Sequence, residues 1–545
     1  MTGAIPPPRW WGWAERPGDG VPEAGLAMLR EELGGLEAPQ PRVALEDVRL
    51  PIPRLPKATR AQIESIVGEE NVVRDRLVRV SHALGKSYPD LVRIRSGDGG
   101  SAPDAVVCPG SHDEVAAVLL ACAEARVAVT PFGGGTSVVG GVEPRRDGLA
   151  GAISLDLRRL DRVDADVESL TATLGAGLTG PAAEALLARR GLTLGHHPQS
   201  WEFATIGGYV ATRSAGQAST GYGRIDEMVL GLRLAAPVGE VVVKPHPASA
   251  AGPALRELLV GSEGALGAIT EATLAVRRVP EVRRYEGWSF RTFSAGVEAF
   301  RRLEQEHLSP DVARLSDEEE TRVSLALSVS GSAAERAGLA YLRLRGHAGG
   351  SIVICGFEGD TERVAVRRAL AARLLKAGGG LPLGSRPGRA WLRSRYLAPY
   401  LRDDLLDAGV MVETLETATS WSNLLDLHGA VREALRGALE ARGTPPIVWC
   451  HVSHLYPSGA SLYFTFVARQ ERGAEIEQWR AAKSAACDAI VANGGTITHH
   501  HAIGTDHLPW MEAEIGPVGL ELLRGAKRVL DPQGIMNPGK LVPPE

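Results

Sequence analysis

The spacing of apolar and polar residues predicts alternating strands and helices through most of the chain. A short β-branched run at 126–130 predicts a buried strand. Ahead of it, Ser111 and Glu114 have the spacing of a capping box, which predicts a helix running from Val115 to about residue 126. Three further strands are predicted at 105–109, 152–156 and 169–174.

The pattern changes at about residue 281 and predicts a cap with an antiparallel sheet. Residues 282–290 alternate like a half-exposed strand, and strands and helices then alternate to about residue 500. Within 461–467, Tyr463 shares one face with Thr465 and Val467. The opposite face is wholly apolar and is expected to pack into the cap core. That face consists of Leu462, Phe464 and Phe466.

A glycine-rich loop, Pro131 to Gly141, follows the strand at 126–130. Its three consecutive glycines permit positive φ angles and leave backbone N–H groups open to a ligand, so the loop is suited to a pyrophosphate. A Walker loop is excluded because no Gly-Lys-Ser/Thr follows, and the G-x-G-x-x-G fingerprint fails at Val138. A flexible linker is the alternative, but linkers are polar and this run is bracketed by apolar segments.

Two later stretches are also rich in small residues. The first begins at His196, contains Thr-Ile-Gly-Gly at 205–208 and continues to Ile225; the second is Gly-Ser-Glu-Gly-Ala-Leu-Gly at 261–267. Long runs of small residues inside a globular domain indicate close backbone approach to a flat or extended ligand.

Composition narrows the class of protein. The 545 residues suggest two to four domains, and a net charge of −5 gives no reason to expect a nucleic-acid partner. Five scattered cysteines without CxxC spacing fit a reducing cytosol. The first residues lack the features of a secretory signal, the last are not a peroxisomal Ser-Lys-Leu, and no apolar run reaches membrane-spanning length. Trp10, Trp11 and Trp13 are expected to anchor a proline-rich N-terminal arm onto the body.

A run of three histidines, His499, His500 and His501, is the second candidate site. It could be an exposed run without a role, a metal site, or an acid/base cluster poised near neutral pH. The run is read as a strand, on which side chains alternate, so at most His499 and His501 share a side. Two histidines without a carboxylate nearby in sequence make a poor metal site.

The three glycine-containing loops, in this order, resemble those of FAD-linked oxidases of the vanillyl-alcohol-oxidase, PCMH-type family. The resemblance implies an α+β fold: a PCMH-type FAD-binding domain of two α/β subdomains, and a cap domain with an antiparallel sheet and flanking helices. The implied divisions are an N-terminal arm and helical region at 1–99, the FAD domain at 100–280, the substrate-binding cap at 281–505, and a C-terminal helical segment at 506–545 that returns to the FAD domain.

The same resemblance implies FAD as cofactor. Attachment is expected to be non-covalent, because covalent members usually have a histidine or cysteine in or near the glycine loop, where this chain has Phe132 and Thr136. The implied FAD-binding residues are Pro131, Phe132, Gly133, Gly134, Gly135, Thr136, Ser137, Pro198, Ser200, Thr205, Gly207, Gly208, Ser214, Gly216, Tyr222, Gly223, Glu263, Gly264, Gly267 and Ile269.

The later motifs narrow the resemblance. Flavin-linked D-2-hydroxyacid dehydrogenases hold a metal with His-x-Gly-Asp-Gly-Asn-x-His and a later Glu-His-Gly. Here the Gly-Asp-Gly-Asn core is absent, Tyr463 takes the place of the second histidine and His500 that of the glutamate, so no metal is expected. The triple histidine with Tyr463 instead resembles the alkyldihydroxyacetonephosphate synthase family. Tyr456, Gly459, Ala460 and Phe464, Glu416 and Thr417 with Trp421, and residues 314–317 support this.

That family implies a reaction without net redox chemistry. A proton leaves C1 of an acyl-dihydroxyacetone phosphate, the carboxylate departs while a flavin N5 adduct holds the carbon, and a long-chain alcohol attacks to give an ether lipid. Carried across, Tyr463 is the acid/base, the three histidines are active-site partners, and Arg314 and His451 bind substrate. Neighbouring imidazoles and a pocket of reduced dielectric are expected to tune the phenol, whose ordinary pKa is ~10.

Alternatives remain at this point. His451 stands where the family has an arginine, and histidine does not replace its bidentate phosphate bonding well. An FAD-linked oxidase or dehydrogenase of a hydroxy acid or alcohol is therefore the second interpretation, and a flavin-binding scaffold without turnover the third. The expected partners are a small-molecule or lipid-like substrate and a second copy of the chain. The expected location is cytoplasmic, with peripheral membrane contact.

Overall fold

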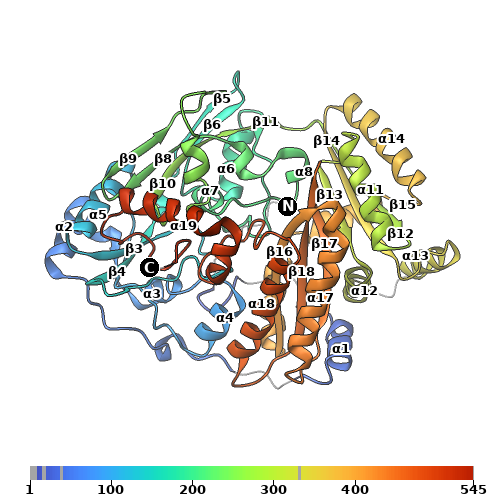
Figure 1. Ribbon diagram of the computed structural model, residues 1–545, viewed down its shortest axis with the longest axis horizontal. Helices are drawn as coiled ribbons and strands as arrows, with labels where there is room; N and C mark the ends of the chain where they lie inside the picture. Colours follow the sequence, from blue (N-terminus) through green and yellow to red (C-terminus); the bar gives the residue numbers. More distant parts are fainter. Residues whose placement is uncertain (1–8, 15–19, 37–40, 329–332, 544–545) are drawn as a thin grey trace.

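The computed structural model describes residues 9–14, 20–36, 41–328 and 333–543. It has two lobes (Figure 1): one holds most of the first 280 residues, and the other is built on a large sheet from the second half of the chain. The expectations about the first eight and the last two residues lie outside the described residues. Within the described parts of the chain, no helix combines the length and apolar character needed to cross a membrane.

The first lobe begins with a small sheet of order β1-β2-β4-β3. The three strands β2, β4 and β3 are parallel, and β1 pairs antiparallel at the edge. Their residues are nearly all buried, as expected for parallel strands covered on both faces. The bounds are β1 Val72–Val73, β2 Ala105–Val107, β3 Val127–Phe132 and β4 Gly151–Asp156.

Helix α5 (His112–Glu124) joins β2 to β3, where a helix is predicted. Ser111 caps it by accepting from the Glu114 N–H, as predicted, but the predicted return bond from the Glu114 side chain to the cap residue is wrong. The Glu114 carboxylate accepts from Gly110 N, one residue before the cap, at 2.7 Å. The chain turns tightly enough before the helix for the side chain to reach that earlier donor.

A second sheet in this lobe is antiparallel, with order β5-β6-β10-β8-β9. Helices α6 (Gly180–Ala188) and α7 (Ile206–Thr212) contribute Leu187, Tyr209 and Val210 to the core beside it. The strands are β5 Val163–Asp166, β6 Thr171–Gly175, β8 Val229–Ala236, β9 Gly239–Val243 and β10 Ala268–Ala275.

The second lobe contains a seven-stranded antiparallel sheet of order β15-β12-β14-β13-β17-β18-β16. Helices α11 (Phe293–Gln305), α14 (Thr361–Ala377), α17 (Leu424–Glu440) and α18 (Glu475–Ala492) lie against it. The strands are β12 Val282–Phe290, β13 Val312–Ser316, β14 Ser351–Gly359, β15 Leu381–Gly384, β16 Val410–Ser420, β17 Ile447–Tyr456 and β18 Gly459–Arg469.

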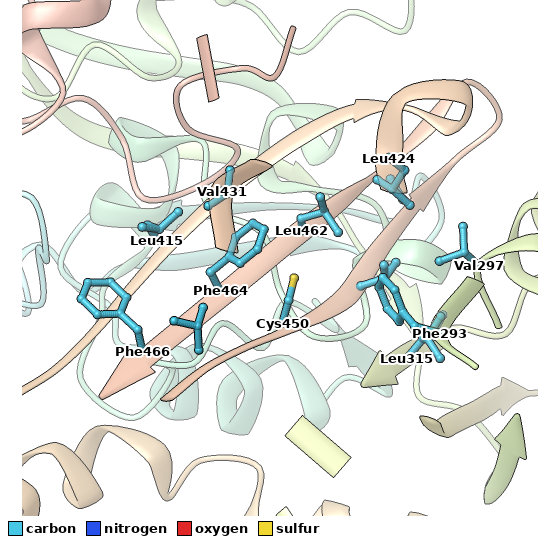
Figure 2. Packing of buried hydrophobic residues seen from close by; sticks show 14 of the residues in the cluster. Phe293, Val297, Leu315, Leu415, Leu424, Val431, Cys450, Leu462, Phe464 and Phe466 are labelled. Atoms are coloured by element: carbon cyan, nitrogen blue, oxygen red, sulfur yellow. The ribbon is translucent and has the colours of Figure 1, made fainter. Parts of the chain in front are cut away.

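The predicted apolar face of β18 is confirmed. Leu462, Phe464 and Phe466 are fully buried and pack with side chains of α17 and β17, such as Val431 and Cys450 (Figure 2). Burying side chains of this size stabilises the fold by roughly 1.5–3 kcal/mol each. The opposite face of β18 is thereby left for the interior between the lobes.

Both ends of the chain return to this body. Helix α19 (Met511–Leu530) donates from Lys527 to Ala265 O. The Asn537 amide donates to the carbonyls of Gly141 and Glu263, which both lie in predicted flavin loops. At the other end, Trp13 is buried and its backbone N–H donates to Asp403 at 2.8 Å. The predicted docking of the arm through this tryptophan is therefore confirmed, whereas the proposed domain boundaries stay predictions.

Candidate active site

A cavity of about 520 Å³ lies where the glycine-containing loops face the sheet of the second lobe. Its walls include the N-terminal arm through Trp13 and Leu29, the flavin-type loops, and the strands β16, β17 and β18. This is the face of β18 that carries Tyr463, Thr465 and Val467.

The glycine loop needs its glycines because neighbouring chain passes so closely. A Cβ on Gly133 would stand 2.2 Å from Thr205 Oγ1, and one on Gly134 2.1 Å from Phe203 O. Gly135 has φ +65°, and its Cβ would strike the Phe132 ring. The loop and the Thr-Ile-Gly-Gly segment therefore form one cradle with exposed backbone. This concave, side-chain-free wall fits the pyrophosphate and ribityl part of FAD.

Most predicted FAD-binding residues come together at this wall. Seventeen of the twenty line the cavity, and the three exceptions are Gly216, Tyr222 and Gly223. For the last two, FAD binding stays a prediction that the cavity lining does not support. Tyr222 is buried elsewhere and donates to Glu358 of the cap sheet, and Gly223 ends helix α8 (Ser219–Tyr222) with φ +92°. Gly216 lies behind the wall, where a Cβ would meet His197 N at 2.6 Å.

Tyr463 sits in a row of polar residues across three strands. Glu416 on β16 and His451 on β17 are its register partners on either side. The rings of His451 and Tyr463 stack with centroids 4.8 Å apart. Burial raises the pKa of Tyr463 above its usual value, against the opposing effects of Thr414 and Arg402. The expected tuning of the phenol towards neutral pH is therefore wrong, because a pocket of reduced dielectric disfavours the phenolate.

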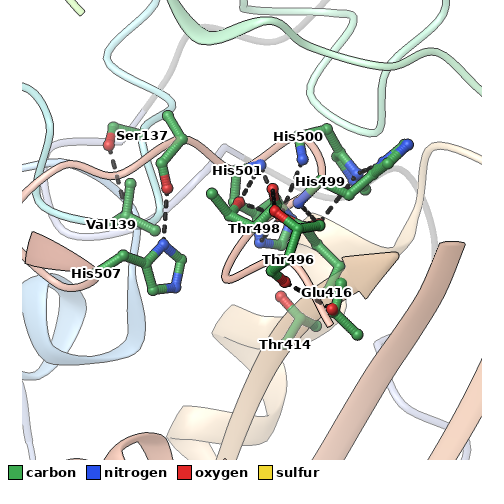
Figure 3. A network of polar contacts seen from close by, with 12 residues as sticks. Ser137, Val139, Thr414, Glu416, Thr496, Thr498, His499, His500, His501 and His507 are labelled. Carbon is green, nitrogen blue, oxygen red and sulfur yellow. Dashed lines mark hydrogen bonds and ion pairs between the residues drawn. The ribbon is translucent and has the colours of Figure 1, made fainter. Parts of the chain in front are cut away.

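The three histidines lie on a loop, not on a strand (Figure 3). Glu416 organises this loop: it accepts from the backbone N–H groups of His499, His500 and His501 and from the Thr498 hydroxyl. Burial raises the pKa of the Glu416 carboxyl, yet that pKa is held well below its usual value, and the hydrogen bond from Thr498 contributes to this lowering.

Two expectations about the histidines need correction. His499 and His500 share a side, as the 2.9 Å distance between their Nδ1 atoms shows. The reason is that a bent backbone does not alternate its side chains as a strand does. Burial also lowers the pKa of all three below its ordinary value, so the imidazoles stay neutral and are not poised near neutral pH. His500 and His501 line the cavity. His499 does not line it but contacts His500, which does.

Two of these histidines also form a group with His454 whose spacing suits a metal ion. Ring nitrogens of His454, His499 and His500 all lie within 4.8 Å of one another. Nitrogen ligands at this spacing suit zinc when a fourth ligand is added. The metal-free site stays a prediction.

Arg314 and His451, the predicted substrate-binding pair, both line the cavity and contact each other. Arg314 also forms an ion pair with Glu320 at 2.7 Å, and His451 Nδ1 lies 3.0 Å from the same carboxylate. Burial raises the pKa of Glu320, but Arg314 and His451 bring it down to about 2. The cation of Arg314 is thus compensated before any substrate binds.

Arg402 is a cavity-lining cation that the sequence patterns do not predict. It lies on α16 (Ala398–Asp407), pairs with Glu413 at 2.8 Å and donates to Lys86 O. No motif marks it. The available signal is an arginine at a buried position of an amphipathic helix, and such a position is rarely charged unless the charge is paired.

Comparisons with known proteins agree with this geometry. Residues 103–243 match the family described as FAD binding domain, and residues 279–541 match FAD linked oxidases, C-terminal domain. A p-cresol methylhydroxylase structure shares the fold alone, with a TM-score of 0.68 at 15% identity over 89% of this chain and 96% of that one. The fold and its loops define a PCMH-type flavoprotein, which confirms the predicted α+β class and FAD as cofactor.

Two closer relatives identify the family. Alkyldihydroxyacetonephosphate synthase of Trypanosoma brucei brucei is 35% identical over 516 residues, covering 93% of this chain and 84% of that protein. A solved alkyldihydroxyacetonephosphate synthase structure superposes with a TM-score of 0.84 at 31% identity, covering 98% of each chain. The chain belongs to the alkyldihydroxyacetonephosphate synthase family of FAD-dependent enzymes.

Proposed function

We propose that this enzyme exchanges the acyl group of an acyl-dihydroxyacetone phosphate for a long-chain alcohol and so forms an alkyl ether lipid. One observation carries the proposal: the cavity joins a polar end beside the flavin loops to a long apolar wing. A substrate with a charged head and an alkyl chain matches both ends, whereas a small hydroxy acid would leave the wing without a ligand group to bury.

The apolar wing lies over the sheet on the side of Tyr463. Leu29 of α1 (Glu23–Glu32) and Val323 of α12 (Glu318–Ser328) cover it from one side, and Val412 and Val467 form its floor. Leu405 and Trp449 extend the same wall. Burying a methylene group there contributes about 0.8 kcal/mol, so a long chain gains considerable binding free energy from this wing.

The polar end offers a cation for a phosphate. Arg402 faces the cavity next to Thr414, and its planar fork suits bidentate phosphate binding. This removes the difficulty raised by His451, because the arginine expected near that strand is supplied by helix α16 instead. Glu413 balances the charge when no substrate is bound.

Proton transfer is assigned to Tyr463 and its neighbours. Because burial raises its pKa, the Tyr463 hydroxyl is protonated at neutral pH and can donate to the leaving carboxylate. His500 and His501 are neutral and can donate or accept at the same substrate. FAD, when bound in the cradle, supplies the group that holds the substrate carbon between departure of the acyl group and arrival of the alcohol.

Isotope transfer tests the proposal. The FAD-loaded enzyme is incubated with an acyl-dihydroxyacetone phosphate and a long-chain alcohol labelled with oxygen-18. The expected products are free fatty acid and an ether lipid that retains the label, with no electron acceptor consumed. Absence of exchange, together with flavin bleaching by hydroxy acids, would overturn the proposal.

One observation favours a second function, oxidation of a hydroxy acid. The histidine group His454, His499 and His500 has a spacing that a divalent metal could bridge. Stoichiometric zinc or manganese in the purified enzyme, with activity abolished by a chelator, would support that function over ether formation.

The proposal also covers the cellular location and the assembly of the enzyme. We infer a cytoplasmic homodimer with peripheral membrane contact, through which a lipid substrate would be exchanged. All five cysteines are free thiols, which agrees with a reducing compartment.

A further inference from the structure

Tyr456 connects a cation outside the histidine cluster to the histidines themselves. Its hydroxyl lies 2.6 Å from His499 Nε2, and the guanidinium of Arg224 acts on the same hydroxyl through its charge and through hydrogen bonding. His499 Nδ1 in turn lies 2.9 Å from His500 Nδ1. The four side chains form a continuous line that ends at the cavity wall.

The positions of the protons along this line follow from what each group can donate. An arginine has donors only, so the Tyr456 oxygen must turn a lone pair towards Arg224. The hydroxyl proton then points to its other contact, His499 Nε2. If His499 donated there instead, the hydroxyl proton would have no acceptor among its described contacts, at the cost of an unmade buried hydrogen bond.

The positions of the ring protons on His499 and His500 follow from that of the Tyr456 hydroxyl proton. With Nε2 accepting, neutral His499 carries its proton on Nδ1, which donates to His500 Nδ1. His500 therefore carries its own proton on Nε2. Glu416 is the group that could reverse this, since one of its oxygens faces His500 Nδ1, but that oxygen is 3.6 Å away and the carboxylate already accepts from three backbone N–H groups and Thr498.

From this geometry we infer that Tyr456, oriented by Arg224, is a positioning residue that locks His499 and His500 in one tautomer, so that His500 presents an Nε2–H donor to the substrate. His500 lines the cavity beside Tyr463, with ring centroids 5.8 Å apart. In this state it serves as a hydrogen-bond donor, not as a base, and proton removal from the substrate falls to His501. The inference rests on the proposed function only for its kinetic consequences.

Nitrogen NMR tests the tautomers without any substrate. FAD-loaded enzyme with ¹⁵N-labelled imidazoles, with signals assigned through the His499→Gln and His500→Gln variants, should show Nδ1–H at His499 and Nε2–H at His500. In Tyr456→Phe the His499 signals should change to a mixture of tautomers. The inference is overturned if His500 carries its proton on Nδ1 in the parent enzyme. This readout is independent of whether ether formation is the correct activity.

Kinetics of the same variant give the second test. Tyr456→Phe should lower kcat on the order of 10-fold to 100-fold, the scale seen when a partner that orients a functional histidine is lost, with little change in KM or FAD content.

Two further variants separate positioning from folding. Arg224→Lys keeps a group that can only donate hydrogen bonds, so it should retain most of the activity. Arg224→Gln introduces an oxygen that can accept the Tyr456 hydroxyl proton and turn it away from His499. This variant should therefore resemble Tyr456→Phe. Tyr285→Phe is the matched control, since that hydroxyl bonds Glu358, away from the histidines. Equal losses of kcat in Tyr456→Phe and Tyr285→Phe would overturn the inference. No exchange in the parent enzyme would instead refute the proposed function.

Discussion

The rings of His451 and Tyr463 stack with an interplanar angle of 20°, because the two residues are direct register partners on β17 and β18. His451 is held in turn by Arg314 and Glu320, so the phenol stands against a fixed surface. Its hydroxyl position is therefore determined by the sheet and not by a mobile loop.

Replacement of Tyr463 tests its role as the group that moves a proton. Tyr463→Phe keeps the stacked ring and should leave folding and FAD content intact, while turnover falls ~10²-fold or more, the usual scale of a lost general acid/base. Turnover is measured on the ether-forming reaction. Near-normal turnover would leave the histidines as the main candidates.

Arg402 should determine recognition of the phosphate. Because Arg402→Met alone would leave Glu413 buried and unpaired, the informative variant is Arg402→Met with Glu413→Gln, compared with Glu413→Gln alone. Loss of a charged hydrogen bond of about 1.5–3 kcal/mol should raise KM for the phosphorylated substrate about 10-fold to 100-fold. An unchanged preference over the dephosphorylated analogue would contradict this role.

The apolar wing should set the preferred chain length. Val323→Phe places a ring in the wing, and each methylene it excludes costs about 0.8 kcal/mol, or roughly fourfold in affinity. Rates with long-chain alcohols should fall while those with short ones stay constant. Val366→Phe is the control, because Val366 is 59% exposed on α14. Equal effects on all chain lengths would show that the chain does not lie there.

The glycine cradle should be required for flavin. In Gly134→Ala the new Cβ would lie 2.1 Å from Phe203 O, so the loop must move, and flavin absorbance per protein after gel filtration should drop sharply. Gly437→Ala, with no atom within 4 Å of its Cβ, should keep full flavin content. Acid precipitation of the parent enzyme should leave the yellow colour in the supernatant; colour in the pellet would show covalent attachment.

Glu263 should make stability depend on pH. Burial raises its pKa to about 7, above the ordinary value of 4.5, although Ile503 N and Gly504 N donate to it. Between these values the folded state keeps a proton that the unfolded state has lost, so stability falls as pH rises. Relative to Glu263→Gln, the free energy of unfolding should decrease by on the order of 3 kcal/mol between pH 4.5 and 7, then level off. A constant difference in urea titrations would refute this.

Local patterns predicted those parts of the site that local sequence controls. The period of two placed Tyr463 and Phe464 on opposite faces of β18, and the glycine runs located the flavin loops. Arg402 and the apolar wing escaped prediction because they arise where helices distant in sequence meet the sheet. The histidine loop was misjudged as a strand because Glu416, 83 residues earlier than His499, provides the hydrogen bonds that bend it.

The cavity combines Trp13 near one end of the chain with His501 near the other. On the ribosome, the wall that contains Trp13 is made long before the wall that contains His501. The nascent chain therefore cannot form a closed active site until the histidine loop has emerged. A translation product truncated before this loop would keep the flavin cradle but lack the histidines.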